Sequence, residues 1–219
     1  RFDDGTSIGI TYFKGWAGKI GFFTDQRRRG VASENSPSGG YKGYVEYTRA
    51  NHQFFTDLEI GGDVLGLREV YAPYNYHMVE GGLEKYFKLP AWDHALELRG
   101  KGGFIGERVD PFFFLYAGGL PGMRGYSYYS LGGERTAIAT ATYRFPLIRN
   151  AGWNLWPLTV NRIYGSVFTD VGNAWRGKFE ADSLKTDIGA GLRFQMHSFY
   201  AYPTAVAVDV AYGLDKFAV

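Results

Sequence analysis

The chain has 219 residues, enough for one domain or one large barrel, and its 24 basic and 22 acidic residues leave a net charge of +2. This balance argues against a polyanion such as nucleic acid as a partner, because such binding normally requires a basic face. The absence of cysteine excludes a disulfide framework and a thiolate zinc site. The 31 glycines and the 18% of aromatic residues, without strong helical periodicity, predict an all-β protein.

Alternation of apolar and polar residues marks a series of strands along the chain, because successive side chains of a strand point to opposite faces. No apolar run reaches the roughly 18 residues of a membrane helix. The segment 61–76 shows no regular pattern. We therefore expect strands at 7–13, 18–24, 41–50, 54–60, 83–89, 95–101, 136–145, 164–171, 187–198 and 205–212.

A polar loop at 26–40 separates two of these strands and carries three consecutive arginines, Arg27, Arg28 and Arg29. One interpretation is an ordinary solvated loop. The alternative is contact with the phosphates of lipopolysaccharide, because clustered cations attract anionic head groups.

The last two strands decide between a soluble sandwich and a membrane barrel. One face of them is apolar and the other mixes charged residues with glycine and alanine, which suits a crowded, wet lumen. Strands of about ten residues can cross a bilayer at a tilt, and the aromatics of 153–156 and 199–202 suit interfacial girdles. We predict a transmembrane antiparallel β-barrel, with a soluble β-sandwich as the alternative. Leu192, Phe194, Val206, Val208 and Val210 are expected to face lipid, and Arg193, Gln195 and Asp209 the lumen.

A glycine-rich and aromatic segment of about 28 residues, 107–134, lies between clear strands. Connections of this length are uncommon unless they are functional or disordered. Glycines at 118, 119, 132 and 133 let the backbone turn sharply. Because the segment is apolar, we expect it to fold back into the protein and to place Arg124 there. The alternative is that Arg124 is an ordinary solvated loop residue.

Three motifs resemble one family, the BamA-type outer-membrane assembly factors and two-partner secretion translocators, also called the bacterial surface antigen family. The first runs from Gly118-Gly119 through Met123-Arg124-Gly125-Tyr126 to Gly132-Gly133, followed by Phe145-Pro146-Leu147. The second is the stretch 167–175, similar to the family's Phe-x-Asp-x-Gly strand. The third is 187–193, similar to its Gly-x-Gly-Leu-Arg strand. The stretch 198–215 resembles the barrels fused to periplasmic β-propeller repeats.

The resemblance implies a sixteen-stranded outer-membrane barrel of a diderm bacterium, with 107–134 as the sixth extracellular loop folded into the lumen. The chain 1–219 would be a single barrel domain of about ten C-terminal-side strands, incomplete at both ends and unable to close by itself. The resemblance also places Phe168 and Asp170 inward, so we expect Asp170 to pair with Arg124 through two parallel hydrogen bonds. The family often carries a lumenal glutamate before Pro146, where this chain has Thr142 and Arg144, so a second acidic partner for Arg124 stays open.

The resemblance implies insertion or translocation of proteins at the outer membrane, without a cofactor or a metal. The alternatives are a structural anchor or subunit of a larger envelope complex and a passive pore. Expected partners are outer-membrane lipids including lipopolysaccharide, client barrel or secreted proteins, and periplasmic or envelope-complex proteins, but no nucleic acid. The four histidines, at 52, 77, 94 and 197, sit in no nucleophile motif, so we expect no enzymatic activity. The other domains of the full-length protein would discriminate between these functions. Small α/β repeats would favour assembly or secretion, and propeller repeats would favour an anchor.

Overall fold

The structure is a computed structural model that describes residues 14–28, 39–53, 58–60, 63–65, 74–90, 93–109, 111–199 and 202–214. The strand expected at 7–13, Arg29 and the last five residues lie outside the described residues.

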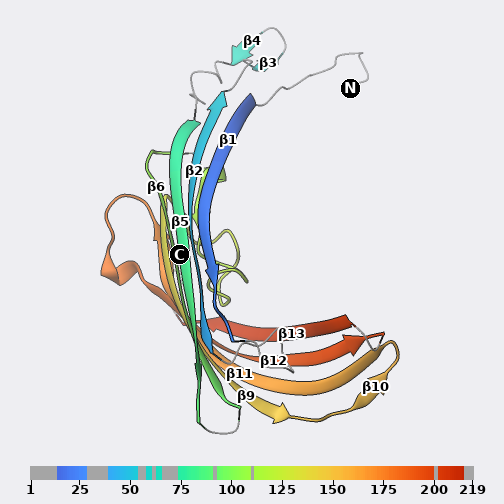
Figure 1. Ribbon diagram of the computed structural model, residues 1–219. Helices are drawn as coiled ribbons and strands as arrows, with labels where there is room; N and C mark the ends of the chain where they lie inside the picture. The colour runs from blue at the N-terminus through green and yellow to red at the C-terminus, as the bar shows by residue number, and fades with distance from the viewer. Residues whose placement is uncertain are drawn as a thin grey trace.

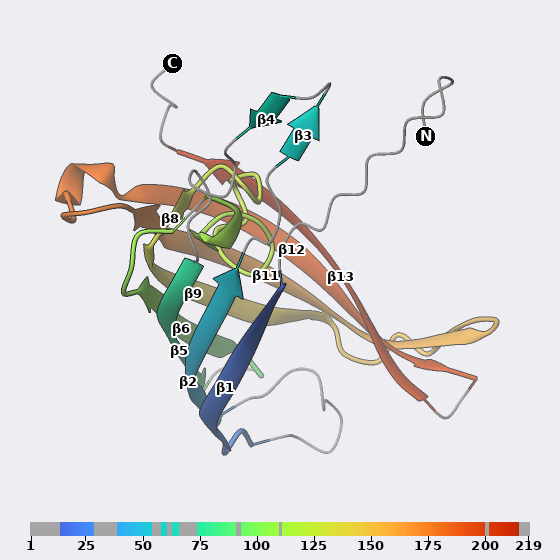
Figure 2. The same ribbon diagram turned by 90° about the horizontal axis from the view of Figure 1, so that it is seen from above.

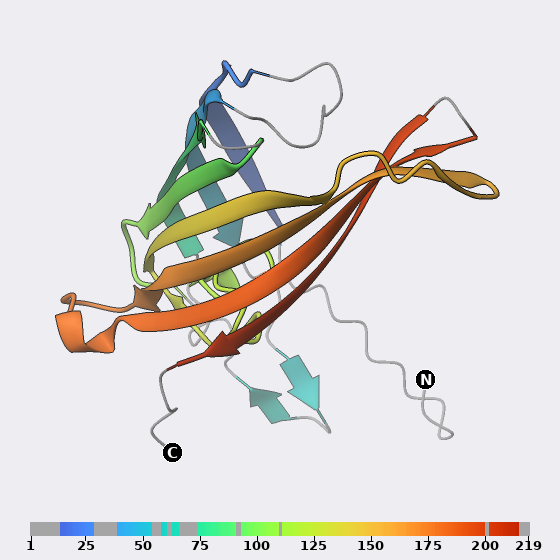
Figure 3. The same ribbon diagram turned by 90° about the horizontal axis from the view of Figure 1, so that it is seen from below.

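A curved antiparallel sheet of nine strands makes up the described chain (Figure 1). Its strands, in spatial order, are β1 (Lys14–Asp25), β2 (Gly40–Gln53), β5 (Tyr74–Lys88), β6 (Ala95–Ile105), β9 (Arg135–Ile148), β11 (Leu158–Trp175), β12 (Lys185–Ser198) and β13 (Tyr202–Gly213), with β10 (Trp153–Leu155) paired to β11. The sheet is open, with β1 and β13 as its edges among the described strands, so the prediction that these residues do not close a barrel is confirmed. The start of β11 extends beyond β9, and it pairs there with β10 on one side and with β12 on the other (Figure 3).

Two short hairpins complete the described strands. One pairs β3 (Leu58–Ile60) with β4 (Asp63–Leu65), and the other pairs β7 (Leu115–Tyr116) with β8 (Gly132–Gly133). The described part of the chain has two helical segments, each a single turn: η1 (Pro111–Phe113) and η2 (Ala181–Ser183). Among the described residues, no helix has the length and apolarity needed to cross a membrane.

Most expected strands lie inside observed ones, and the main differences fall in the first half of the chain. The strand expected at 83–89 is the end of β5, which begins at Tyr74, so the irregular segment predicted at 61–76 is partly wrong. Gly81 and Gly82 hide the alternation of β5, because a glycine gives no apolar signal on either face. The strand expected at 54–60 is described only as the three residues of β3.

The two faces of the sheet differ as the alternation predicted. Val206, Val208 and Val210 are 46–73% exposed on the convex face. The concave face carries buried polar side chains, namely Thr136, Thr140, Thr142, Asp170, Asp187 and Gln195. Met196, which shares the outward phase of Leu192, is instead buried against Val160 and Ile163, where the register of β11 shifts at a bulge. The residues joining β6 to β9 lie on the concave side (Figure 1, Figure 2).

The antiparallel pairing sorts the connections between two ends of the sheet. The 106–134 loop and the β11–β12 connection lie at one end. The β1–β2, β5–β6, β9–β11 and β12–β13 connections lie at the other. Arg27 and Arg28 are therefore at the end opposite the 106–134 loop.

Candidate functional site

The loop between β6 and β9 is built on its own backbone hydrogen bonds. The pair β7–β8 closes its base, and Ala117 N donates to Leu131 O at 2.9 Å. Met123 N donates to Ala117 O at 2.7 Å, and Gly119 N lies 3.0 Å from Met123 O and 2.9 Å from Tyr126 O. These bonds satisfy buried backbone groups, so the loop has a defined path rather than a solvated one.

An apolar cluster fixes the loop on the sheet. Met123 is fully buried and Tyr126 is 4% exposed. They pack with Ala117 and Leu131 of the loop and with Ile138 of β9 and Ala174 of β11. Because the cluster joins loop and wall, burying Met123 holds the arginine that follows it against the sheet.

Two glycines of the motif occupy positions that a larger residue could not take unchanged. Gly119 has φ +83°, in the left-handed region. A Cβ at Gly125 would lie 2.5 Å from the Cβ of Asp187 and 2.7 Å from the backbone N of Gly213. A Cβ at the other predicted glycines, Gly118, Gly132 and Gly133, would lie at most 2.7 Å from other atoms. At Gly125 and Gly133 the loop backbone thus lies close to the wall, whereas Gly118 and Gly132 lie against other residues of the loop.

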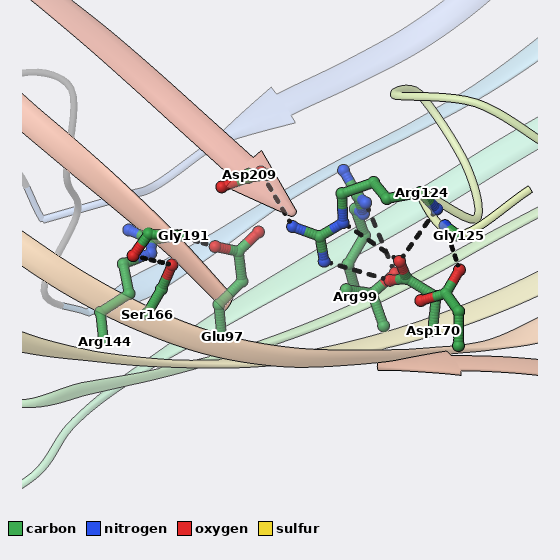
Figure 4. Close-up of polar contacts among 11 residues, drawn as sticks. Glu97, Arg99, Arg124, Gly125, Arg144, Ser166, Asp170, Gly191 and Asp209 are labelled. Atoms are coloured by element: carbon green, nitrogen blue, oxygen red, sulfur yellow. Dashed lines mark hydrogen bonds and ion pairs between the residues drawn. The ribbon is translucent and has the colours of Figure 1, made fainter. Parts of the chain in front are cut away.

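Arg124 reaches from the loop to Asp170 on β11 (Figure 4). Its Nε donates to Asp170 Oδ2 at 3.1 Å and its Nη2 to Oδ1 at 3.2 Å, while the Arg124 backbone N lies 3.3 Å from Oδ2. The Asp170 side chain is fully buried and that of Arg124 is 12% exposed. This two-pronged pair is the geometry that suits a planar guanidinium and a carboxylate.

Two further groups enclose the guanidinium. The Arg124 Cζ lies 3.2 Å from the centroid of the Phe168 ring, so the cation stacks on an aromatic face. Arg124 Nη1 donates to Asp209 Oδ2 on β13 at 3.3 Å. Arg124 therefore bridges two strands that are separated by β12.

The strand between them, β12, forms hydrogen bonds with Gly125 and Tyr126, the two loop residues that follow Arg124. Gly125 N donates to Asp187 Oδ2 at 2.8 Å, and Tyr126 Oη donates to Thr186 O at 3.0 Å. Asp187 is opposite Asp170 in the register and is fully buried. Three successive loop residues thus contact β11, β12 and β13, the last three strands of the described sheet.

A cavity of about 200 Å³ adjoins this site on the concave face, and four arginines with two carboxylates line it. Arg144 forms an ion pair with Glu97 on the neighbouring strand. The family often has a glutamate in the strand before Pro146. This chain has Arg144 there instead, and its acidic partner, Glu97, lies on β6. The cavity is lined by Arg99, Arg124, Arg144, Arg193, Glu97 and Asp209, among other residues.

The structure brings together the site residues proposed from the sequence: Met123 to Tyr126 lie in the loop, with Phe168 and Asp170 facing them. Sequence reasoning did not find Asp187 and Thr186 as partners, and it left the second acid of Arg124 open. Asp209 takes that place. Its inward phase was readable from the sequence, but its proximity to Arg124 depends on the path of the loop across β12.

A family profile of the Omp85 superfamily domain matches residues 72–199, more than half of the chain. This chain belongs to the Omp85 superfamily. Omp85 proteins are outer-membrane proteins, and the superfamily is one of protein insertion and translocation. The matched residues include the 106–134 loop with Arg124 and both aspartates that face it on β11 and β12, whereas Asp209 lies beyond the match. A search of curated proteins gives no match.

His77, His94 and His197 contact side chains of neighbouring strands. His94 contacts Tyr143, and Asn161 Nδ2 lies 2.5 Å from His197 Nδ1. In the part of the chain that the structure describes, no group of three or more histidine, aspartate or glutamate residues is arranged to hold a metal ion. The absence of catalysis, of a cofactor and of a metal, and the link to propeller repeats, stay predictions.

Proposed function

We propose that this chain is part of an outer-membrane barrel that inserts or translocates proteins, and that the 106–134 loop braces its wall from the lumen. The observation that carries the proposal is the pair of ion pairs that Arg124 forms. They join the loop to β11 through Asp170 and to β13 through Asp209. Bracing here acts on the last three strands of the described sheet, next to its edge at β13. An incoming strand can pair with an edge strand only if the backbone of that edge strand is held in an extended conformation.

The convex face supports a position in lipid. Large apolar side chains are exposed along successive strands, among them Phe22 at 72%, Leu83 at 58% and Val208 at 55%. Soluble proteins rarely expose a continuous apolar surface that covers several strands. An outward apolar band with polar residues on the other face is the pattern of a membrane barrel.

The edge strand β13 supports a role in strand pairing. Its outward side chains are apolar, and on the side away from β12 its backbone N–H and C=O groups have no partner strand within the part of the chain that the structure describes. Such groups need partners inside the hydrocarbon layer, where each unsatisfied one costs several kcal/mol. A client strand that pairs there gains these hydrogen bonds, so the edge can act as a template.

The test is client insertion by the full-length protein in liposomes. Arg124→Ala and Asp170→Asn are expected to slow the folding of an outer-membrane client, whereas Arg149→Ala, at the opposite end of the sheet, should match the unaltered protein. An unaltered protein that conducts ions but accelerates no client would favour a passive pore. Arg124→Ala with unaltered insertion would contradict the bracing role.

A further inference from the structure

A second cavity, which we call the rim cavity, lies at the end of the sheet where the 106–134 loop begins. Its volume is about 330 Å³. Three arginines and two glutamates line it: Arg108 and Glu107 follow β6, Glu134 and Arg135 lie at the start of β9, and Arg176 follows β11. Chain segments far apart in the sequence thus gather cations at one place.

Both carboxylates of the rim cavity are engaged. Glu134 Oε1 lies 3.8 Å from Arg176 Nε. Glu107 Oε2 accepts a hydrogen bond of 2.7 Å from the backbone N of His77, outside the cavity. Within the described residues, Arg108 and Arg135 form no ion pair with a carboxylate, so the cavity has two cations without an anionic partner.

Contacts with neighbouring residues hold two of the guanidinium groups in place, and these contacts do not use all of their N–H donors. Arg135 Nη1 donates to Gly177 O at 2.7 Å, and its Cζ lies 5.2 Å from the centroid of Phe104. Arg176 lies 4.4 Å from the centroid of Phe114. A guanidinium has five N–H donors, so one carbonyl acceptor leaves Arg135 with others. A site ordered in advance binds more tightly, because less freedom is lost on binding.

We propose that the rim cavity binds a phosphate group. Planar guanidinium forks match phosphate oxygens, and the three arginines outnumber the two glutamates of the cavity, so its charged lining has a net charge of +1 that attracts an anion. Arg27, at the start of the β1–β2 connection, does not offer such a site, because its side chain is occupied by Asp25 at 2.6 and 2.8 Å.

The position of the cavity suits a lipid head group as the source of the phosphate. Arg135 stacks on Phe104, which is 43% exposed on the convex face. The cavity would then lie just above the apolar band, at the height of head groups in the outer leaflet. This choice of source rests on the proposed membrane position, whereas the phosphate chemistry does not, and a soluble phosphate compound is the other source.

The experiment measures binding by the full-length protein in nanodiscs of zwitterionic lipid, at low salt. The probes are lipopolysaccharide, its dephosphorylated form and inorganic phosphate. Arg108→Gln breaks no hydrogen bond or ion pair of the described residues, and it is expected to weaken binding of the phosphorylated probe about 10-fold, the effect of one charge-assisted hydrogen bond. Arg149→Gln, with the same charge change at the opposite end, should leave binding unchanged.

The outcomes separate the two sources. Preference for phosphorylated lipopolysaccharide that is lost in Arg108→Gln supports the head group. Binding of inorganic phosphate that is lost in this variant, without discrimination between the lipids, supports a soluble phosphate compound. Equal binding of all phosphorylated and phosphate-free probes, or equal loss in Arg149→Gln, would overturn the site. Since Arg108 lies outside the Arg124 site, its variant should insert clients normally, and a failure of insertion by the unaltered protein would leave the binding result intact.

Discussion

Replacing Arg124 by alanine removes one set of contacts between the loop and the sheet, those that its side chain makes with β11 and β13. The variant loses both side-chain hydrogen bonds to Asp170, the bond to Asp209 and the stacking on Phe168. Because Asp170 is fully buried and Arg124 is 12% exposed, the change leaves a buried carboxylate without its cation. The expected cost is about 3–5 kcal/mol. Arg124→Lys should recover only part of it, since an ammonium cannot reproduce the fork.

Hydrogen exchange of the loop amides in the full-length protein measures this cost as a local opening free energy. Gly119 and Met123, whose amides are bonded within the loop, are the reporters. A loss of 3–5 kcal/mol speeds their exchange by roughly 10²- to 10⁴-fold. The double variant with Asp170→Asn should exchange no faster than the worse single variant, because the two side chains form one interaction.

The control for this measurement is Arg149→Ala, which should leave exchange of the loop amides unchanged. A rate change of less than about 3-fold in Arg124→Ala, near 0.6 kcal/mol, would refute the reasoning. Additive effects of the two single variants would also show that the pair does not hold the loop.

Three smaller perturbations follow from the same geometry. Asp209→Asn should cost only about 1 kcal/mol by the same exchange measurement, because its side chain is 27% exposed and its ion pair is screened; a loss equal to that of Arg124→Ala would contradict this. Gly125→Ala should cost about 1–3 kcal/mol, since its Cβ would overlap the wall at 2.5 Å, and unchanged exchange would show that the loop can shift. Val208→Arg should lower the unfolding free energy in vesicles by about 2–4 kcal/mol if it lies near the midplane, and a loss no greater than that of Ala207→Arg would argue against lipid contact.

Much of the sheet could be predicted from the sequence because alternation is a local property. The strands β9, β12 and β13 follow their apolar and polar phases closely, and a partly wrong reading of β5 arose where glycines erased the signal. The pairing of Arg124 with Asp170 was expected only through the family motifs. The sequence around Arg124 and the sequence around Asp170 do not by themselves indicate that the two side chains are in contact.

The rest of the site depends on how the chain crosses in three dimensions. Asp209 meets Arg124 because the loop passes over β12 and reaches β13. The rim cavity is a similar case: Arg108, Arg135 and Arg176 are isolated in the sequence, and only strand register brings them together. Arg27 and Arg28 of the conspicuous arginine run, by contrast, lie at the end of the sheet away from the loop.

An experimental structure of the full-length protein in a lipid nanodisc tests the central claim most directly. The distance to measure joins the Arg124 guanidinium nitrogens to the Asp170 carboxylate oxygens. We expect two contacts near 3.1 and 3.2 Å, with the loop on the concave side of the wall. A separation well beyond hydrogen-bond reach, with the loop projecting outside the barrel, would contradict both the pairing and the bracing role.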